Sequence, residues 1–396
     1  MNILMILEGT FPPDRRVENE INALIDAGHN VHLFCVRHSL KKPNNEFGRQ
    51  LIIHRIYMPR ILFKKVKVSV LKFNFYNSYW KMRIIRQSNK IPIQFNVIHI
   101  HDLPLSKLGI KLAHYFKSYL IVDLHENYPA AIKVWKHTKG LLGKYFFQVK
   151  MWKNYEKEIV EIADRIIVVI DEAKSRFEQN IQNKVVVVSN TQEINSLPTQ
   201  LERKTDHKLK YVYLGGIGPH RGIEAVIDYF NHSQIFDRFS KFSIVGSGTG
   251  KENLKRKVYD LGISDKINIL GFLPQDEALK IVNEHDIGII PHIRSEHTNT
   301  TIPHKLFQYM ALGLPVIVSN CLPLIKIVEE TNCGWVFESG NQNSFIDVIN
   351  IITKNKKSVK EKGINGRNAV EKIYNWSIDA KRLVNMYSHL EKEKRN

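Results

Sequence analysis

The sequence predicts an α/β fold of two doubly wound, parallel-sheet domains that face each other across a cleft. Short apolar runs alternate with amphipathic stretches of helical spacing, the pattern of parallel strands covered by helices on both faces. A polar, proline-containing stretch at residues 190–208 interrupts this alternation. The length of 396 residues also exceeds what one compact core usually organises, so two domains are expected.

The first domain is predicted at residues 1–190 from a repeated strand, helix and strand pattern. The apolar run at 3–7 predicts a buried strand, the amphipathic stretch at 18–27 a helix, and the apolar run after Gly28 a second strand. The alternation continues, with strands expected at 97–100, 120–122 and 166–170 and helices expected at 107–116 and 144–162.

Residues 191–209 are predicted to link the domains, because the apolar periodicity lapses there. The second domain is expected at residues 210–375, and an amphipathic segment follows at 376–396. The strands of the second domain are expected at 211–214, 242–245, 267–270, 287–290 and 316–318, with helices that include 222–230 and 305–312. Because such sheets bind ligands at the carboxyl ends of their strands, we expect a ligand in the cleft.

The chain is strongly basic, with 58 Lys and Arg residues against 39 Asp and Glu residues and a net charge of +19. This excess predicts an anionic partner: a nucleic acid, an anionic membrane or a phosphorylated ligand. Most of it lies at residues 41–90, which hold thirteen Lys or Arg residues and one acidic residue among many aromatic residues. We interpret this segment as a membrane-surface element, with Lys64, Lys65, Lys67 and Trp80 against anionic lipid, rather than as a nucleic-acid site. The alternative is a solvated helix whose aromatic residues face the core.

The three cysteines lie far apart, so neither a disulfide framework nor a cysteine-based zinc site is expected, and a reducing, cytoplasmic compartment follows. The N-terminus lacks the basic start and the cleavage-type sequence of a signal peptide, and no run of eighteen apolar residues occurs. We therefore expect neither export by a standard signal nor a membrane span.

Polar residues and a glycine follow the predicted strands of the first domain, at the edge where such sheets bind ligands. Gly9 either lets a backbone approach a ligand closely or serves only the turn. His101 ends one strand and His125 follows the next, each beside a carboxylate. These groups suit metal binding, acid–base chemistry or hydrogen bonds to sugar hydroxyls. The alternation along the strand favours a structural role for His99.

Glycines also follow the strands of the second domain. Gly215 and Gly216 let backbone amides face an anion, and Gly246 begins a second glycine pair at a neighbouring strand end. Arg221 comes just before a predicted helix, where its forked guanidinium suits a phosphate. Both features indicate an anionic ligand.

A later helix start has the features of a diphosphate site. Thr301 is expected to cap this helix and Pro303 to lie in its first turn. Thr300, Thr301 and Ile302 would then offer backbone amides and the helix dipole to a diphosphate. Gln308 lies about one turn further along the same helix.

In their order and spacing, several segments together resemble retaining glycosyltransferases of family 4, which have the GT-B fold of two Rossmann-like domains. The matching segments are FPPDRRVENEINALIDAGHNVHLF, IHIHDLP, VDLHE, ADRIIVVIDEA, VGSGTGKENL, LGFLPQDE and PHKLFQYMALGLPVIVS. The resemblance implies that the second domain holds a nucleotide-diphosphate sugar and the first domain holds the acceptor. It also implies a terminal helix that crosses back to the first domain, and chemistry without a metal or another cofactor.

The resemblance also assigns roles to individual residues. His125 matches the family histidine near the reacting sugar, and Arg221 matches the basic residue on the donor diphosphate. Gln308 stands where the family normally has a ribose-binding glutamate, and Gly216 stands where an arginine is common. Lys305 either replaces that missing cation or is a solvated helix residue.

The remaining expected contacts lie in the matched segments. Donor contacts are expected at Gly9, Gly215, Gly216, Gly246, Phe272, Leu273, Thr300, Thr301, Ile302, Lys305 and Gln308. Acceptor or membrane contacts are expected at Arg15, Arg16 and His101, in addition to the four residues of the basic segment named above.

The resemblance predicts transfer of a hexose-like sugar to a glycan or lipid-linked glycan in cell-surface polysaccharide synthesis. The enzyme is expected in the cytoplasm, peripherally bound to the inner face of the cytoplasmic membrane. One alternative is a related GT-B enzyme that epimerises a nucleotide sugar. Another is a degenerate protein that only binds glycan or lipid, which the departures at Gly216 and Gln308 would favour.

Overall fold

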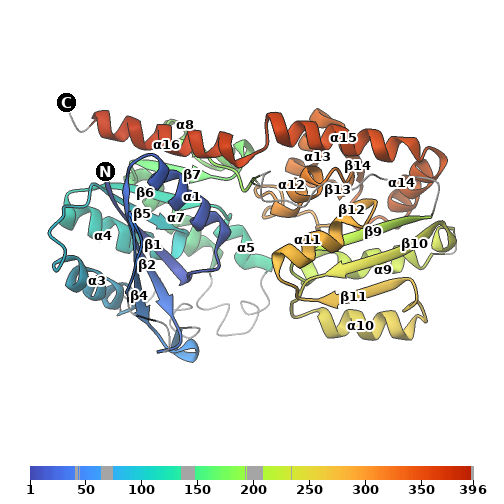
Figure 1. Ribbon diagram of the computed structural model, residues 1–396, viewed down its shortest axis with the longest axis horizontal. Helices are drawn as coiled ribbons and strands as arrows, with labels where there is room; N and C mark the ends of the chain where they lie inside the picture. Colours follow the sequence, from blue (N-terminus) through green and yellow to red (C-terminus); the bar gives the residue numbers. More distant parts are fainter. Residues whose placement is uncertain are drawn as a thin grey trace. The chain divides into compact units, whose positions relative to one another are not determined.

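The computed structural model describes residues 1–40, 43, 45–63, 75–134, 148–191, 193, 208–232 and 234–393 (Figure 1). The chain divides into two compact units, of which the first comprises Met1–Ser189 with Asp379–Asn396 and the second comprises Asn190–Ile378. Lys64, Lys65 and Lys67 lie outside the described residues. Among the described residues, no helix combines the length and apolarity that crossing a membrane requires.

The first unit contains an eight-stranded sheet in the order β3-β4-β2-β1-β5-β6-β7-β8. All neighbouring strands are parallel except β3 and β4. The strand order reverses between β1 and β5, which is the topological switch point of a doubly wound sheet. The strands are β1 (Asn2–Thr10), β2 (Asn30–Arg37), β3 (Asn45–Phe47), β4 (Leu51–Tyr57), β5 (Val97–His101), β6 (Tyr119–Leu124), β7 (Arg165–Val168) and β8 (Val185–Val187).

The helices of the first unit alternate with these strands. Asp14 begins α1 by accepting a hydrogen bond from the Val17 amide, as an N-cap residue does. The buried face of α1 carries Glu20 among apolar residues, and a fully buried glutamate is unusual. The helices are α1 (Arg15–Asp26), α3 (Phe75–Ser88), α4 (Ser106–Phe116), α5 (Tyr128–Val134), α7 (Val149–Ile162), α8 (Gln179–Gln182) and α16 (Trp376–Glu393), with 3₁₀ turns at Leu103–Leu105 and Asp171–Arg176.

The second unit contains a six-stranded parallel sheet in the order β11-β10-β9-β12-β13-β14, which reverses between β9 and β12. Its strands are β9 (Leu209–Leu214), β10 (Phe239–Val245), β11 (Ile267–Gly271), β12 (Ile287–Ile290), β13 (Val316–Ser319) and β14 (Gly334–Phe337). Its helices are α9 (Ile223–Phe230), α10 (Lys251–Asp260), α11 (Gln275–Asn283), α12 (His304–Ala311), α13 (Leu322–Thr331), α14 (Gln342–Lys354) and α15 (Lys357–Lys372), with 3₁₀ turns at Pro219–Arg221 and Phe236–Arg238. Both units therefore have the predicted α/β class.

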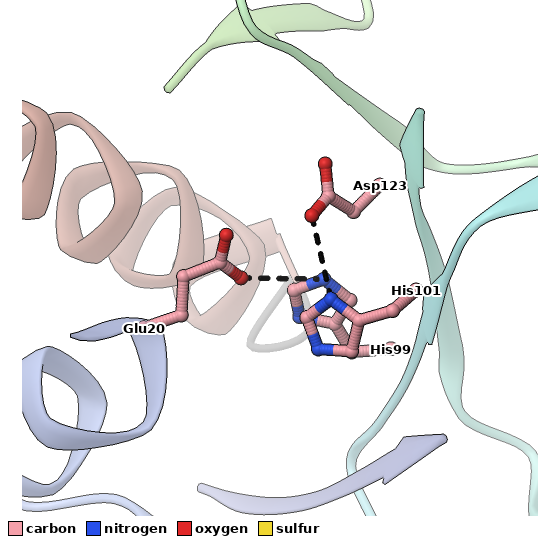
Figure 2. A group of neighbouring side chains, drawn as sticks. All are labelled: Glu20, His99, His101 and Asp123. Carbon is pink, nitrogen blue, oxygen red and sulfur yellow. Dashed lines mark hydrogen bonds and ion pairs between the residues drawn. The ribbon is translucent and has the colours of Figure 1, made fainter. Parts of the chain in front are cut away.

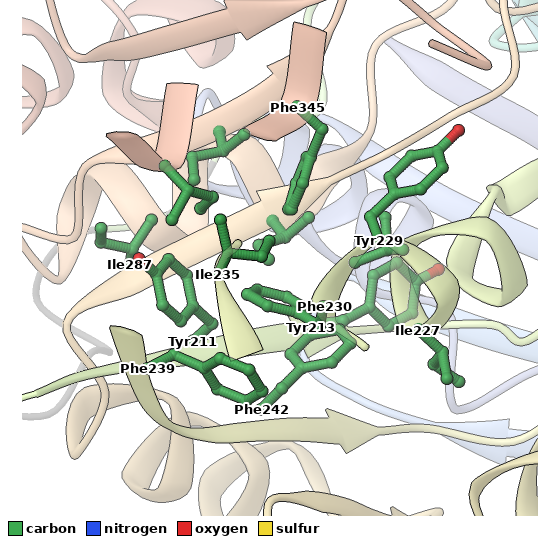
Figure 3. Close-up of a cluster of buried hydrophobic side chains, with 14 of the residues drawn as sticks. Tyr211, Tyr213, Ile227, Tyr229, Phe230, Ile235, Phe239, Phe242, Ile287 and Phe345 are labelled. Carbon is green, nitrogen blue, oxygen red and sulfur yellow. The ribbon is translucent and has the colours of Figure 1, made fainter. Parts of the chain in front are cut away.

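Aromatic packing around Phe230 holds α9 on the second sheet (Figure 3). The Phe230 ring is fully buried, and its centroid lies 4.5 Å from that of Phe239 and 5.1 Å from that of Phe242. Phe345 of α14 packs edge-on against the same ring at 5.3 Å. Because these contacts join two helices to the sheet, Phe230 is central to the core of this unit.

Replacing Phe230 with alanine should destabilise the second unit by about 3–5 kcal/mol, because it removes a buried ring and leaves a cavity. Chemical denaturation followed by fluorescence measures this loss. Phe272→Ala is the matched control, since the Phe272 side chain is 77% exposed and its removal should change the free energy of unfolding little. Equal losses in the two variants would contradict the assignment of Phe230 to the core.

Candidate functional site

A buried ion-pair group lies at the carboxyl ends of β5 and β6 in the first unit. Arg16 of α1 binds Asp123 in two places, with Nε 2.8 Å from Oδ2 and Nη2 2.9 Å from Oδ1. The same Nε lies 3.1 Å from Oε1 of Glu20, one helical turn away. Burial acts in the opposite direction, but Arg16 and hydrogen bonds from histidines hold the pKa of Asp123 well below its usual value. Burial raises the pKa of Glu20 to about 7 against the opposing effect of Arg16.

Two stacked histidines complete this buried group. Figure 2 shows Glu20 and Asp123 pointing toward the rings of His99 and His101, whose centroids are 4.5 Å apart. Nδ1 of His101 lies 3.3 Å from Oδ2 of Asp123, and Nδ1 of His99 lies 2.7 Å from the Tyr387 hydroxyl of α16. Burial lowers the pKa of His99, which favours a neutral ring. His99 therefore has a structural role, as expected.

The donor atoms of Glu20, His99, His101 and Asp123 lie within 4.8 Å of one another, as the ligands of a metal ion would. Arg16, however, occupies both oxygens of Asp123 and also contacts Glu20. A divalent cation there would lie beside a buried guanidinium and compete with it for the same carboxylates. The group therefore fits an internal ion-pair network better than a metal site.

His125 is the partly exposed end of this network, with 22% of its side chain exposed. Its Nε2 lies 3.3 Å from Oδ1 of Asp102, and its Nδ1 lies 3.6 Å from Oδ2 of Asp123. Burial opposes protonation, but the two carboxylates outweigh it and raise the pKa of His125 to about 10. Asp102 has a φ of 69°, a conformation that only a few non-glycine residues adopt. The backbone is thus strained at the residue whose carboxylate meets the imidazole.

Two residues of the first unit that were expected to contact an acceptor or a membrane are buried instead. Arg16 and His101 were expected to meet an acceptor or a membrane, but the side chain of Arg16 is only 8% exposed and His101 is fully buried. Both instead support Asp123. The sequence did hold a signal for this network, since Arg16 and Glu20 are one turn apart on the apolar face of α1.

The expected membrane contact at Trp80 is wrong, because Trp80 is fully buried. Trp80 and Tyr76 lie on the buried face of α3. This agrees with the alternative expectation, a helix whose aromatic residues face the core. Phe75 and Met82, at the spacing of the opposite face, are 69% and 58% exposed.

In the second unit, glycines bring two strand-end loops into close contact. Gly246 has a φ of 149°, and a Cβ there would lie 1.9 Å from the carbonyl oxygen of Gly215. Gly215 in turn donates its amide to the carbonyl of Val245 at 2.8 Å. Gly216, in contrast, has open space around it, since a Cβ there would meet no atom within 4 Å.

Basic side chains gather beside these loops. Gly222 has a φ of 68° and packs against Pro291, because a Cβ there would lie 1.9 Å from the Pro291 carbonyl oxygen. This packing places Arg221 beside β12, where Nη1 lies 3.0 Å from Nε2 of His292. Burial and then repulsion from Lys305 and Arg221 lower the pKa of His292.

Lys305, in the first turn of α12, is the buried amine of this group. Lys305 is only 7% exposed. The alternative expectation, that it is a solvated helix residue, is therefore wrong. Its Nζ lies 3.9 Å from the centre of the Tyr213 ring. A Cβ on Gly215 would lie 2.9 Å from the same atom, so the amine lies directly beneath the glycine loop.

The segment before α12 differs from the expected helix start. Pro303 is the N-cap and offers no side-chain hydrogen bond, while Thr301 donates its hydroxyl to the carbonyl of His297 at 3.0 Å. The Thr300 amide also donates to His297, at 3.2 Å. Thr301 is thus not the cap, and the Thr300 amide is used within its own turn.

The other expected donor residues differ in their burial. Gln308 is buried on α12, Phe272 is 77% exposed just after β11, and Ile302 is 5% exposed. Leu273 follows Phe272 and is partly buried. In the first unit, Gly9 is partly buried near the end of β1.

Two family models match the chain in succession. Glycosyltransferase Family 4 matches residues 14–191, and Glycosyl transferases group 1 matches residues 199–369. The amylovoran biosynthesis glycosyltransferase AmsK of Erwinia amylovora is 25% identical over 38% of this chain, a match that spans 37% of that protein.

Solved structures resemble the whole chain. Sucrose-phosphate synthase from Thermosynechococcus elongatus has a TM-score of 0.80 at 16% identity and covers 99% of this chain and 100% of its own. Anabaena HepE, solved in complex with UDP, has a TM-score of 0.68 at 12% identity over 98% of this chain and 100% of its own. At such identities the likeness shows the fold, which is GT-B as expected.

Asp102→Asn should lower the pKa of His125 by about one unit or more, because it removes a carboxylate that stabilises the imidazolium. One pKa unit corresponds to about 1.4 kcal/mol of this stabilisation. Asparagine has nearly the same size and shape as aspartate, so the substitution should not add to the backbone strain at this position. NMR titration of the imidazole ring measures the shift. The control is Asp171→Asn, a 64% exposed aspartate of the same unit. An unaltered His125 titration in Asp102→Asn would show that the pairing does not set its charge.

Proposed function

Because the chain belongs to the GT-B glycosyltransferases of family 4, we propose that it moves a sugar from a nucleotide-diphosphate sugar to a glycan or lipid-linked glycan, with retention of the anomeric configuration. The observation that carries this proposal is the group of basic side chains at the strand ends of the second unit. Arg221, Lys305 and His292 lie there together, and among the described residues no carboxylate acts on the pKa of Lys305. Such a site favours a multiply charged anion.

The proposed role of these cations is to stabilise the departing nucleotide diphosphate. Negative charge develops on the diphosphate as its bond to the sugar breaks, and fixed cations nearby lower the energy of that state. Arg221 offers a planar fork of donors to phosphate oxygens. Lys305 supplies the second charge, in place of the arginine that is absent at Gly216. We propose this arrangement rather than a bound metal as the source of positive charge.

The donor's ribose would lie against Gln308. Its amide oxygen accepts a hydrogen bond from a ribose hydroxyl, but without the charge of the family's glutamate the bond is weaker. HepE was solved with UDP, which supports a nucleotide in this fold.

On the acceptor side, we assign His125 to the reacting sugar. The imidazolium that Asp102 and Asp123 favour donates hydrogen bonds and stabilises negative charge near it. By analogy with the family, the acceptor hydroxyl attacks on the face that the diphosphate leaves, and a phosphate oxygen takes its proton. The name of AmsK, an amylovoran biosynthesis enzyme, supports a role in cell-surface polysaccharide synthesis.

Arg221→Ala should slow sugar transfer by about 10²–10³-fold, because it removes a preorganised donor to the developing charge. Mass spectrometry of products from a panel of nucleotide sugars, with and without glycan acceptors, identifies the donor and measures the rate. Rearranged nucleotide sugar without acceptor would indicate epimerisation instead.

The matched control is Arg256→Ala, an exposed arginine of α10 in the same unit. It should leave transfer unchanged. If Arg221→Ala transferred sugar and hydrolysed donor at the wild-type rate, the assignment of the donor site to Arg221 would be wrong.

We further propose that the enzyme binds the inner face of the cytoplasmic membrane through the outer face of α3. Phe75 and Met82 are exposed there, and Arg83 and Arg86 lie at the spacing of the same face. Ile61, just before the part of the segment that is not described, is also exposed, at 74%. Apolar side chains beside arginines suit insertion among anionic headgroups. Lys64, Lys65 and Lys67 stay predictions for the same surface.

The double variant Phe75→Ser with Met82→Ser should bind phosphatidylglycerol-containing vesicles several-fold more weakly, because it removes the inserting apolar area. Vesicle sedimentation measures binding, and phosphatidylcholine vesicles test the dependence on charge. Tyr259→Ser is the control, since Tyr259 is 79% exposed in the second unit. Undiminished binding of the double variant would exclude this face as the membrane contact.

A further inference from the structure

The amine of Lys305 is buried without a hydrogen-bond partner among the described residues. The side chain runs from the first turn of α12 to a point 3.9 Å from the centre of the Tyr213 ring. An ammonium ion can lie over an aromatic face, but that contact replaces only part of the water that burial removes. A permanently charged amine would therefore be costly here.

Arg221 is the charged group beside Lys305, and the other titratable groups packed around the amine are histidines. Arg221 and His220 come from the 3₁₀ turn at Pro219–Arg221, and His292 follows β12. Repulsion from Arg221 lowers the pKa of Lys305, and repulsion from Lys305 lowers the pKa of His220 and of His292. His297 also lowers the pKa of His292. Among the described residues, none of the groups that shift the pKa of Lys305 is a carboxylate.

This environment favours the neutral amine while no anion is bound. Burial, and then repulsion from Arg221, lower the pKa of Lys305 well below its usual value. The same two causes lower the pKa of His220 to about 4. A diphosphate placed beside Arg221 would supply the missing negative charge and favour the protonated form of the Lys305 amine.

We propose that Lys305 binds the donor diphosphate by taking up a proton: the amine is neutral while the site holds no anion, and becomes an ammonium ion when a diphosphate binds. The step adds one proton from solvent to the amine nitrogen, and no other bond changes. This inference rests on the proposed function for the identity of the ligand and adds a pH-dependent mode of binding. Diphosphate affinity should therefore rise as the pH falls through the range between the two pKa values of Lys305, by up to tenfold per pH unit.

Isothermal titration calorimetry of the full chain tests the coupling with two probes, UDP and inorganic pyrophosphate. Titrations at pH 7.5, 8.5 and 9.5 in buffers of different ionisation enthalpy give the number of protons taken up. At pH 7.5 and 8.5 the diphosphate of UDP is essentially ionised, and burial and Arg221 keep His220 neutral, so proton uptake on UDP binding reports the amine. Pyrophosphate keeps a proton of its own over part of this range, so its proton uptake is taken as the difference between the wild type and a variant without the Lys305 amine. For the wild type we expect uptake that approaches one proton per ligand at one or more of these pH values.

Lys305→Met keeps a side chain of similar length, suits a buried site, and removes the titrating group. It should bind both probes at least tenfold more weakly at pH 7.5, and the proton uptake of the wild type should be lost. The matched control is Lys255→Met, a 48% exposed lysine of α10, and it should behave as the wild type. Should His220→Gln abolish the uptake instead, a histidine would be the acceptor and the proposal would fail.

Three outcomes would overturn the inference: binding without proton uptake, equal uptake in Lys305→Met, or no binding of either probe. Failure of the proposed function is a separate result. Pyrophosphate binding with proton uptake but no sugar transfer from any donor would retain the anion site and reject the transferase. Sugar transfer with no proton uptake on binding would retain the enzyme and reject the coupling.

Discussion

The buried pair of Arg16 and Asp123 is the interaction on which the site of the first unit depends. Two charges can be removed from water here because the guanidinium and the carboxylate match in two hydrogen bonds, at 2.8 and 2.9 Å. The pair fixes α1 to the end of β6, and its electrostatic contacts extend to Asp379 of α16. His125 thus receives its charge from a network that three separate parts of the chain assemble.

The two units solve opposite electrostatic problems. In the first unit, carboxylates and basic groups neutralise one another within the fold, so Asp123 needs no partner from outside. In the second unit, Arg221 and Lys305 lie together without a described acidic counterpart, so the balance is incomplete until an anion arrives. Such a site trades some stability of the unliganded protein for affinity, as functional sites often do.

The sequence was sufficient to predict the fold class, because apolar runs and helical periodicity are local signals. It was also sufficient to place His125 just after a strand and Arg221 just before a helix. The burial of Trp80 and Lys305 could not be predicted in the same way, because it depends on which distant elements cover them. Thr301 is not the cap because α12 begins only at His304, and the Thr301 hydroxyl instead donates to the carbonyl of His297.

The open space around Gly216 has a consequence for how this chain can vary. At Gly215 and Gly246 a Cβ would meet backbone atoms or the Lys305 amine, whereas a Cβ at Gly216 would meet nothing within 4 Å. The backbone of the loop can therefore carry a side chain at this position without a clash at its Cβ. A substitution at this position can therefore change the affinity for the donor while the packing of the loop stays the same.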